Sequence, residues 1–154
     1  MVEKGARAPD FTLPSDRDGD ITLSDLRGRR VVLYFYPKDN TSGCTAQACE
    51  LRDELPRFEA GDAVVLGVSP DSVVSHARFR EKHGLNFPLL ADEDHRVAEA
   101  YGVWKEKSMY GRKYMGIERA TYLIDGKGVI RGVWRKVKVA GHVDEILKAV
   151  KALD

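Results

Sequence analysis

The sequence has little that would tie it to a membrane, to nucleic acid or to secretion. No apolar run approaches the roughly 20 residues that cross a bilayer, so no transmembrane helix is predicted. Charge of neither sign is in excess: 25 Lys and Arg offset 24 Asp and Glu, whereas a dedicated nucleic-acid binder carries a plain basic surplus. The opening residues read MVEKGARAPDF and lack the apolar core of a signal peptide, which predicts a cytoplasmic protein.

Cysteine is scarce as well. Only Cys44 and Cys49 are present, too few for the disulfide scaffold of a small secreted domain. Their spacing is C-x-x-x-x-C, so the C-x-x-C motif of a thioredoxin-like disulfide reductase is absent. A zinc site needs about four ligands, and the four histidines are scattered at no ligand spacing, which argues against a metal centre. These histidines are His76, His83, His95 and His142.

The rest of the composition is that of a globular protein. Apolar residues make up 43% of the 154 positions and charged residues 32%, which leaves enough apolar side chains for one core. Because a domain takes roughly 100–200 residues, we expect a single domain over residues 1–154.

Apolar periodicity predicts alternating strands and helices. Residues 31–36 form a continuous apolar run that is typical of a central strand covered on both faces. Residues 43–58 follow with helical spacing, and Pro56 predicts that their last turn kinks or ends. The other predicted elements are a short helix at 24–26 capped by Ser24, a strand (63–68), a helix from Asp71 or Ser72 to Gly84, a short helix (91–101) capped by Asp92, two hairpin strands (121–124 and 129–134) and a final helix from His142. Residues 103–118 show no clean period.

The order of these elements predicts the fold class. Two parallel strands joined by a helix, then a hairpin and a closing helix, are the topology of a thioredoxin-like fold of the α/β class. We therefore expect a central mixed sheet flanked by helices. The first 30 residues are an N-terminal extension of that fold, and residues 85–118 are an insert before the C-terminal hairpin.

Cys44 falls where chemistry is expected in such a fold. It follows the first central strand and begins the first long helix, at the carboxyl end of the sheet where ligands bind in open α/β folds. The free N–H groups and partial positive charge of a helix N-terminus favour a thiolate over a thiol. Residues 37–43 are polar and rich in turn formers, and they offer the Thr41 hydroxyl as a further donor. The alternative is that both cysteines are small, inert core residues.

The spacing of the two cysteines has a geometric consequence. In an ideal helix, five residues separate two Cα atoms by roughly 8–9 Å, beyond the limit of about 7 Å for an unstrained disulfide. If Cys44 and Cys49 pair, the first turns of the helix must therefore unwind. Pairing would then be a conformational switch, on the scale of a local unfolding event.

The residues around Cys44 resemble a known active-site signature. Residues 36–49 read YPKDNTSGCTAQAC, which is similar to the P-x-x-x-T-x-x-C motif of the peroxiredoxins, and the second cysteine five residues on resembles the PrxQ, or bacterioferritin comigratory, branch. Residues 8–11, 116–125 and 134–142 resemble further segments of the same family in the same order. The resemblance covers nearly the whole chain.

The resemblance implies a role for each of five residues. Cys44 is the peroxidatic cysteine, and Cys49 is the resolving cysteine that forms an intramolecular disulfide with it. Thr41 and Arg119 bind and polarise the peroxide, and Pro37 shields the site. From the residues alone, a surface charge is the usual interpretation of a lone arginine, and only the resemblance makes Arg119 a site residue. Thr41 is also a candidate helix cap, and the two roles are compatible.

The resemblance also implies the partners. It implies a thiol peroxidase that acts on hydrogen peroxide and organic hydroperoxides, is recycled by a thioredoxin-type dithiol protein, and needs no metal or organic cofactor. Intrachain pairing favours a monomer, with a weak dimer as the alternative. A redox sensor or holdase, whose disulfide alters partner contacts without turnover, is the competing class of function.

Overall fold

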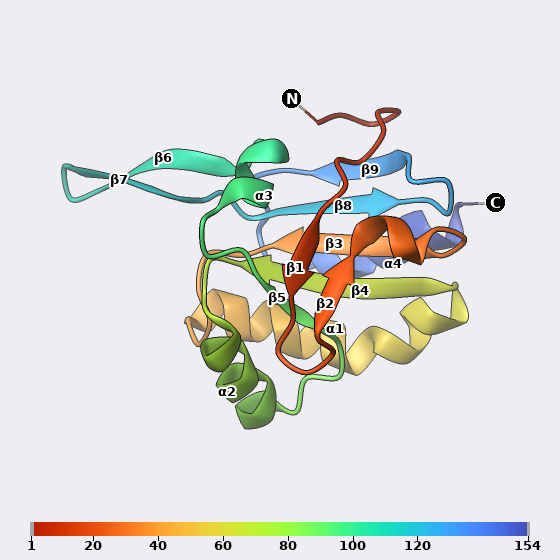
Figure 1. Cartoon of the computed structure of the whole chain (residues 1–154), viewed down its shortest axis with the longest axis horizontal. Coiled ribbons are helices and arrows are strands. Elements are labelled where there is room, and N and C mark those ends of the chain that lie inside the picture. Colours follow the sequence, from red (N-terminus) through yellow and green to blue (C-terminus); the bar gives the residue numbers. More distant parts are fainter. Residues whose placement is uncertain (1, 154) are drawn as a thin grey trace.

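A five-stranded mixed sheet is the centre of the protein, whose computed structural model describes residues 2–153 (Figure 1). The strand order is β5-β4-β3-β8-β9, parallel from β5 to β3 and antiparallel from β3 to β9. These strands are β3 (Arg30–Phe35), β4 (Ala63–Ser69), β5 (Leu89–Ala91), β8 (Ala120–Ile124) and β9 (Ile130–Trp134). The predicted thioredoxin-like α/β fold with a mixed sheet is confirmed.

Helices cover one face of this sheet. They are α1 (Ser42–Ala60), α2 (Val73–His83) and α4 (His142–Lys151). Successive side chains of a strand point to opposite faces, so Val32 and Tyr34 of β3 pack with these helices while Val31 and Leu33 pack on the other side. This double burial explains why the run at 31–36 is apolar throughout.

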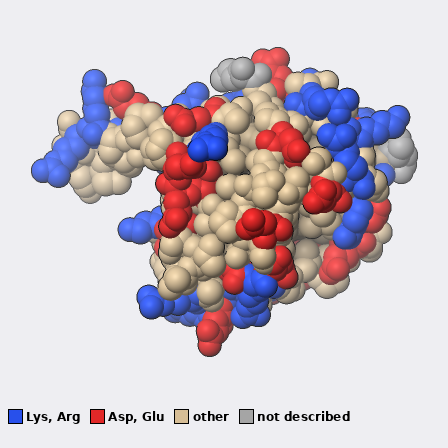
Figure 2. Space-filling model, viewed as in Figure 1, with Lys and Arg blue, Asp and Glu red and all other residues tan. Residues whose placement is uncertain are grey.

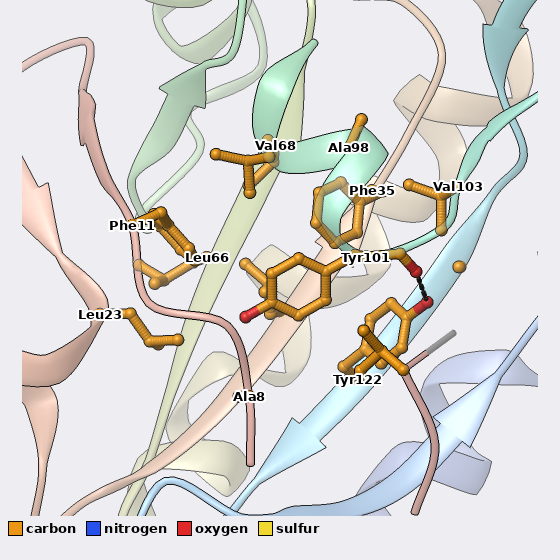
Figure 3. Packing of buried hydrophobic residues seen from close by; sticks show 14 of the residues in the cluster. Ala8, Phe11, Leu23, Phe35, Leu66, Val68, Ala98, Tyr101, Val103 and Tyr122 are labelled. Atoms are coloured by element: carbon orange, nitrogen blue, oxygen red, sulfur yellow. Dashed lines mark hydrogen bonds between the residues drawn. The ribbon is translucent and has the colours of Figure 1, made fainter. Parts of the chain in front are cut away.

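The N-terminal extension and the short helix α3 (Arg96–Ala100) cover the opposite face (Figure 3). The extension includes a small hairpin of β1 (Thr12–Pro14) and β2 (Asp20–Thr22). Tyr101 and Tyr122 meet in this core, and their buried hydroxyls are satisfied: Tyr122 donates to the Tyr101 carbonyl at 2.8 Å and Tyr101 to the Pro9 carbonyl at 2.7 Å.

Two predicted helices differ at their ends. The helix expected over 91–101 is shorter, because Leu89–Ala91 is the edge strand β5 and thus belongs to the sheet rather than to an insert. Asp92 does act as a cap, since its carboxylate accepts from the N–H groups of Val97 and Ala98. Ser24 is not a cap: a 3-10 helix (η1, Leu23–Leu26) begins before it, and its N–H donates to Asp10.

Pro56 does not end α1, which was one of the two outcomes predicted for its last turn. The helix runs on to Ala60, although Pro56 has no N–H for the Arg52 carbonyl four residues earlier. The side-chain amide of Asn86 donates to that carbonyl at 3.2 Å instead. A long-range side-chain contact therefore replaces the hydrogen bond that proline removes.

The stretch without a period, 103–118, is a two-stranded hairpin that projects from the body (Figure 1). Its strands are β6 (Trp104–Met109) and β7 (Arg112–Ile117). Most residues of the hairpin are exposed, whichever face they point to. Its sequence therefore needs no alternation of apolar and polar residues. Figure 2 shows cationic side chains gathered at its tip.

The predicted ends of α2 are confirmed. Ser72 caps α2 by accepting from the Ser75 N–H, and Gly84 ends that helix in the left-handed conformation. No helix within residues 2–153 has the length and apolar character needed to cross a membrane.

Candidate active site

Cys44 lies in the first turn of α1, directly beyond the carboxyl end of β3. Its side chain is buried in the core beneath the helices, whereas Cys49, one and a half turns on, is half-buried. Both cysteines are free, and both belong to one continuous helix. In the wound helix the two Cα atoms are therefore about 8–9 Å apart, too far for a disulfide.

Arg119 reaches the Cys44 sulfur from the neighbouring strand. β8 pairs with β3 so that Ala120 faces Phe35, which places Arg119 beside the start of the loop to α1. Its Nη2 lies 3.3 Å from Cys44 Sγ. Gly43 permits this approach, because a Cβ at that position would lie 3.3 Å from the same Nη2. Arg119 is thus a site residue by position and not a free surface charge.

Gln47 holds the other side of the guanidinium and was not predicted. It is fully buried one turn after Cys44, and its Oε1 accepts from Arg119 Nη1 at 2.6 Å. The spacing of three residues from Cys44 on one helix face was the signal in the sequence that could have identified it. Arg119 is therefore fixed by two contacts, one to the sulfur and one to the amide.

Thr41 and Pro37 lie on the loop that leads into α1. Thr41 is the residue before the first helical position, but its hydroxyl makes no cap hydrogen bond and donates to the Lys38 carbonyl at 2.9 Å. Thr41 is thus exposed at the N-cap position of α1 without the side-chain contact of a helix cap. Pro37 is half-buried at the end of β3.

Neighbouring ionisable groups respond to this charged centre. Burial, reinforced by the Arg119 charge, lowers the pKa of Lys107 in β6 of the projecting hairpin. Burial, reinforced by the Cys44 charge, raises the pKa of Tyr34 on the adjacent strand. In both cases the burial of the group itself is the larger cause, and the charge of Arg119 or Cys44 adds to it.

A group able to hold a cation does exist, although not at the cysteines. Within residues 2–153, one set of side chains brings such ligand atoms within 4.8 Å of one another: Asp39, Asp71 and His76. Their facing atoms are already hydrogen-bonded among themselves and to nearby hydroxyls. The three residues therefore form a polar network, and neither cysteine belongs to it.

Comparisons with known proteins agree with this geometry. Residues 4–133 match the model of the AhpC/TSA family. The chain is 52% identical over 150 residues to peroxiredoxin Bcp of Bacillus subtilis, covering 97% of this chain and 96% of the relative. It is 47% identical over 151 residues to peroxiredoxin Bcp of Escherichia coli K12, with the same coverage.

The chain belongs to the AhpC/TSA family, as a peroxiredoxin of the Bcp type. The resemblance to the PrxQ branch and the thiol peroxidase class are thereby confirmed. Among solved structures, this peroxiredoxin is similar to the bacterioferritin comigratory protein of Xanthomonas campestris, with a TM-score of 0.90, 44% identity, and coverage of 99% of this chain and 97% of the other. A PrxQ variant of Xylella fastidiosa gives a TM-score of 0.93 at 43% identity, with the same coverage.

Proposed function

We propose that Cys44 is the peroxidatic cysteine of a peroxidase that reduces hydrogen peroxide and organic hydroperoxides. The Cys44 thiolate attacks the terminal oxygen of the peroxide. The O–O bond breaks, the sulfur becomes a sulfenic acid, and the leaving oxygen takes a proton and departs as water or an alcohol. The observation that carries this proposal is the 3.3 Å contact between Cys44 Sγ and Arg119 Nη2 at a helix N-terminus.

Arg119 and the loop residues support this step through charge and shape. A guanidinium donor and the free N–H groups of the first turn of α1 stabilise the thiolate. The same donors stabilise the negative charge that develops on the leaving oxygen as the O–O bond breaks. Thr41 supplies a hydroxyl to the bound peroxide, and Pro37 shields the site from solvent.

Cys49 resolves the sulfenic acid in this proposal. Its thiol attacks the Cys44 sulfur, a disulfide forms and water leaves. Because the two cysteines share one wound helix, the first turns of α1 unwind for this step. A thioredoxin-type dithiol protein in the cytoplasm then reduces the disulfide, and the protein works as a monomer because its resolving cysteine lies in the same chain.

The proposed substrates include organic hydroperoxides as well as hydrogen peroxide. The Xanthomonas campestris relative is described as having alkyl peroxide reduction activity, which supports this extension to the present chain.

Peroxide consumption in the presence of a thioredoxin system tests the proposal. We expect the wild type to turn over repeatedly and Cys44→Ser to be inactive. A wild type that is oxidised once and then stops would indicate a sensor rather than an enzyme. Unchanged turnover by Cys44→Ser would exclude Cys44 as the attacking residue.

The role of Cys49 needs its own measurement. We expect Cys49→Ser to form one sulfenic acid per chain without the intramolecular disulfide, as seen by mass spectrometry after a thiol-blocking quench. Normal turnover of this variant through a disulfide-linked dimer would show that Cys49 is not the resolving residue.

A further inference from the structure

A buried polar network lies beneath the loop between β3 and Cys44. The Asp39 carboxylate is 2% exposed and accepts three hydrogen bonds. Tyr36 OH donates to Oδ1 at 2.7 Å, Ser75 OH donates to Oδ2 at 2.8 Å, and His76 Nδ1 lies 2.8 Å from Oδ2. The loop is thereby tied to the first turns of α2.

The network extends from α2 into the sheet. His76 is fully buried, and its Nε2 lies 2.9 Å from the Leu90 carbonyl oxygen of β5. That oxygen can only accept, so Nε2 donates, and a second proton is shared between Nδ1 and Asp39. The main-chain N–H of Asp39 donates to Asp71 Oδ2 at 2.8 Å. Both the backbone and the side chain of Asp39 are therefore held by the body of the protein.

The chain becomes exposed to solvent immediately after Asp39. Asn40 has a positive φ of 62°, an uncommon conformation for a residue other than glycine, and it is exposed. Thr41 and Ser42 are exposed as well. Asp39 is thus the last firmly held residue before the segment that carries Cys44.

We infer that the Asp39–His76 pair is an anchor that fixes where unwinding of α1 stops, and so sets how readily Cys44 reaches Cys49. Asp39 and His76 are positioning residues, and the inference rests on the proposed disulfide step. With Asp39 held, unwinding frees only the chain from residue 40 onward. With Asp39 released, the freed segment begins one residue earlier, at position 39.

The direction of the effect follows from chain entropy. Each further residue released from a fixed backbone conformation favours the unwound state, by about tenfold. Disulfide formation proceeds through the unwound state, so loss of the anchor speeds it. The attack on peroxide uses the wound state, which remains the major form, so that step stays close to its wild-type rate.

Variants that remove one or all of the hydrogen bonds to the Asp39 side chain measure the effect of the anchor on disulfide formation. Ser75→Ala removes one of the hydrogen bonds to the Asp39 carboxylate, and Asp39→Ala removes all three together. Asp39→Asn is the conservative variant: its amide donates to His76 Nδ1 and Ser75, and its oxygen accepts from Tyr36. Leu23→Ala is the control for lost stability, because it opens the core on the opposite face of the sheet, a cluster that contains neither Cys44 nor the side chains of the network.

Two rates are followed after a peroxide pulse. Stopped-flow fluorescence of Trp134, which packs against the core cluster containing Cys44, reports sulfenic acid and disulfide formation in turn. Mass spectrometry measures how much Cys44 is overoxidised to sulfinic acid by a second peroxide, in competition with the disulfide.

We expect Asp39→Ala to form the disulfide about tenfold faster and to overoxidise correspondingly less. For Ser75→Ala the increase should be about threefold, which keeps the test decisive if Asp39→Ala fails to fold. Asp39→Asn and Leu23→Ala should match the wild type in both rates. If the wild type forms the disulfide and both Ser75→Ala and Asp39→Ala form it at the same rate as the wild type, the anchor is overturned and the proposed function is not. A wild type that forms no Cys44–Cys49 disulfide overturns the proposed function with it.

Discussion

Arg119 donates to the Cys44 sulfur through Nη2 and to Gln47 through Nη1, so one planar guanidinium joins two residues of the same helical turn. Cys44 and Gln47 are three positions apart in α1, and Arg119 comes from the adjacent strand. A fork with two donors in fixed geometry can make both contacts at once. Unwinding of this turn breaks both contacts, so the charge leaves the sulfur when the helix opens.

Replacement of Arg119 by lysine tests the fork. We expect Arg119→Lys to slow Cys44 oxidation by hydrogen peroxide about 100-fold, because an ammonium keeps the charge but cannot hold the sulfur and Gln47 together. Single-turnover oxidation kinetics measure this directly. Arg131→Lys in β9, an exposed ion-pair residue, is the matched control and should react like the wild type. Equal rates for Arg119→Lys and the wild type would show that charge alone suffices.

Removal of the second contact is a separate prediction. We expect Gln47→Ala to leave the guanidinium held only by the sulfur and to slow the same oxidation step about fivefold to tenfold, as for the loss of one hydrogen bond to a charged group. Gln47→Glu should not restore the full rate, since its carboxylate accepts the same bond but adds a buried negative charge beside the thiolate. Glu50→Gln on the exposed face of α1 serves as the control. If Gln47→Ala reacts normally, Gln47 is only a core residue.

The sequence predicted the helices and strands in which burial of one or both faces requires a regular spacing of apolar residues. The run at 31–36 is apolar because β3 is covered on both faces, and α4 shows one apolar stripe because one side packs on the sheet. The hairpin at 104–117 has no such constraint and left no pattern. The edge strand β5 is only three residues long, which is too short for an alternation to be recognised.

The site was predictable where the motif is local. Cys44, Thr41 and Pro37 lie within eight residues of one another, and the resemblance of that segment singled them out. The contact between Gln47 and Arg119 spans 72 residues, and that between Asp39 and His76 spans 37. Such contacts depend on strand register and helix packing, which no local pattern encodes.

Stability should depend on pH through His142. Burial lowers the pKa of this residue below its ordinary 6.5, and the Arg119 charge adds to the effect against the opposing charge of Glu145. The unfolded chain therefore takes up a proton from about pH 6.5 downward that the folded chain resists, so the folded state loses stability as pH falls. Above that range the ring is neutral in both states and the contribution is constant.

Urea denaturation of His142→Gln measures this contribution. We expect the wild type to lose more stability than the variant between about pH 7.5 and about pH 5.5. The variant itself loses the hydrogen bond to Thr121 at every pH, so the comparison rests on the slopes and not on the absolute stabilities. Equal slopes would show that His142 takes up its proton alike in the folded and unfolded chains.

The proline inside α1 allows a test by a double-mutant cycle. Asn86 donates to the Arg52 carbonyl that Pro56 leaves without its helical partner. We expect Asn86→Ala to lower the free energy of unfolding by about 1 kcal/mol in the wild type. In Pro56→Ala, the new N–H at position 56 bonds to Arg52, so there Asn86→Ala should cost almost nothing. Pro56→Ala alone should raise the free energy of unfolding by about 1–2 kcal/mol, since proline is disfavoured inside helices but also restricts the unfolded chain.

The coupling between the two positions decides this prediction. Chemical denaturation of all four proteins should give an interaction free energy of about 1 kcal/mol. Strictly additive effects would mean that Asn86 stabilises the protein in some other way and that α1 tolerates Pro56 without compensation. A measured coupling would instead identify the Asn86 contact as the reason α1 continues to Ala60, and would show how a residue outside the helix cancels a local signal to end it.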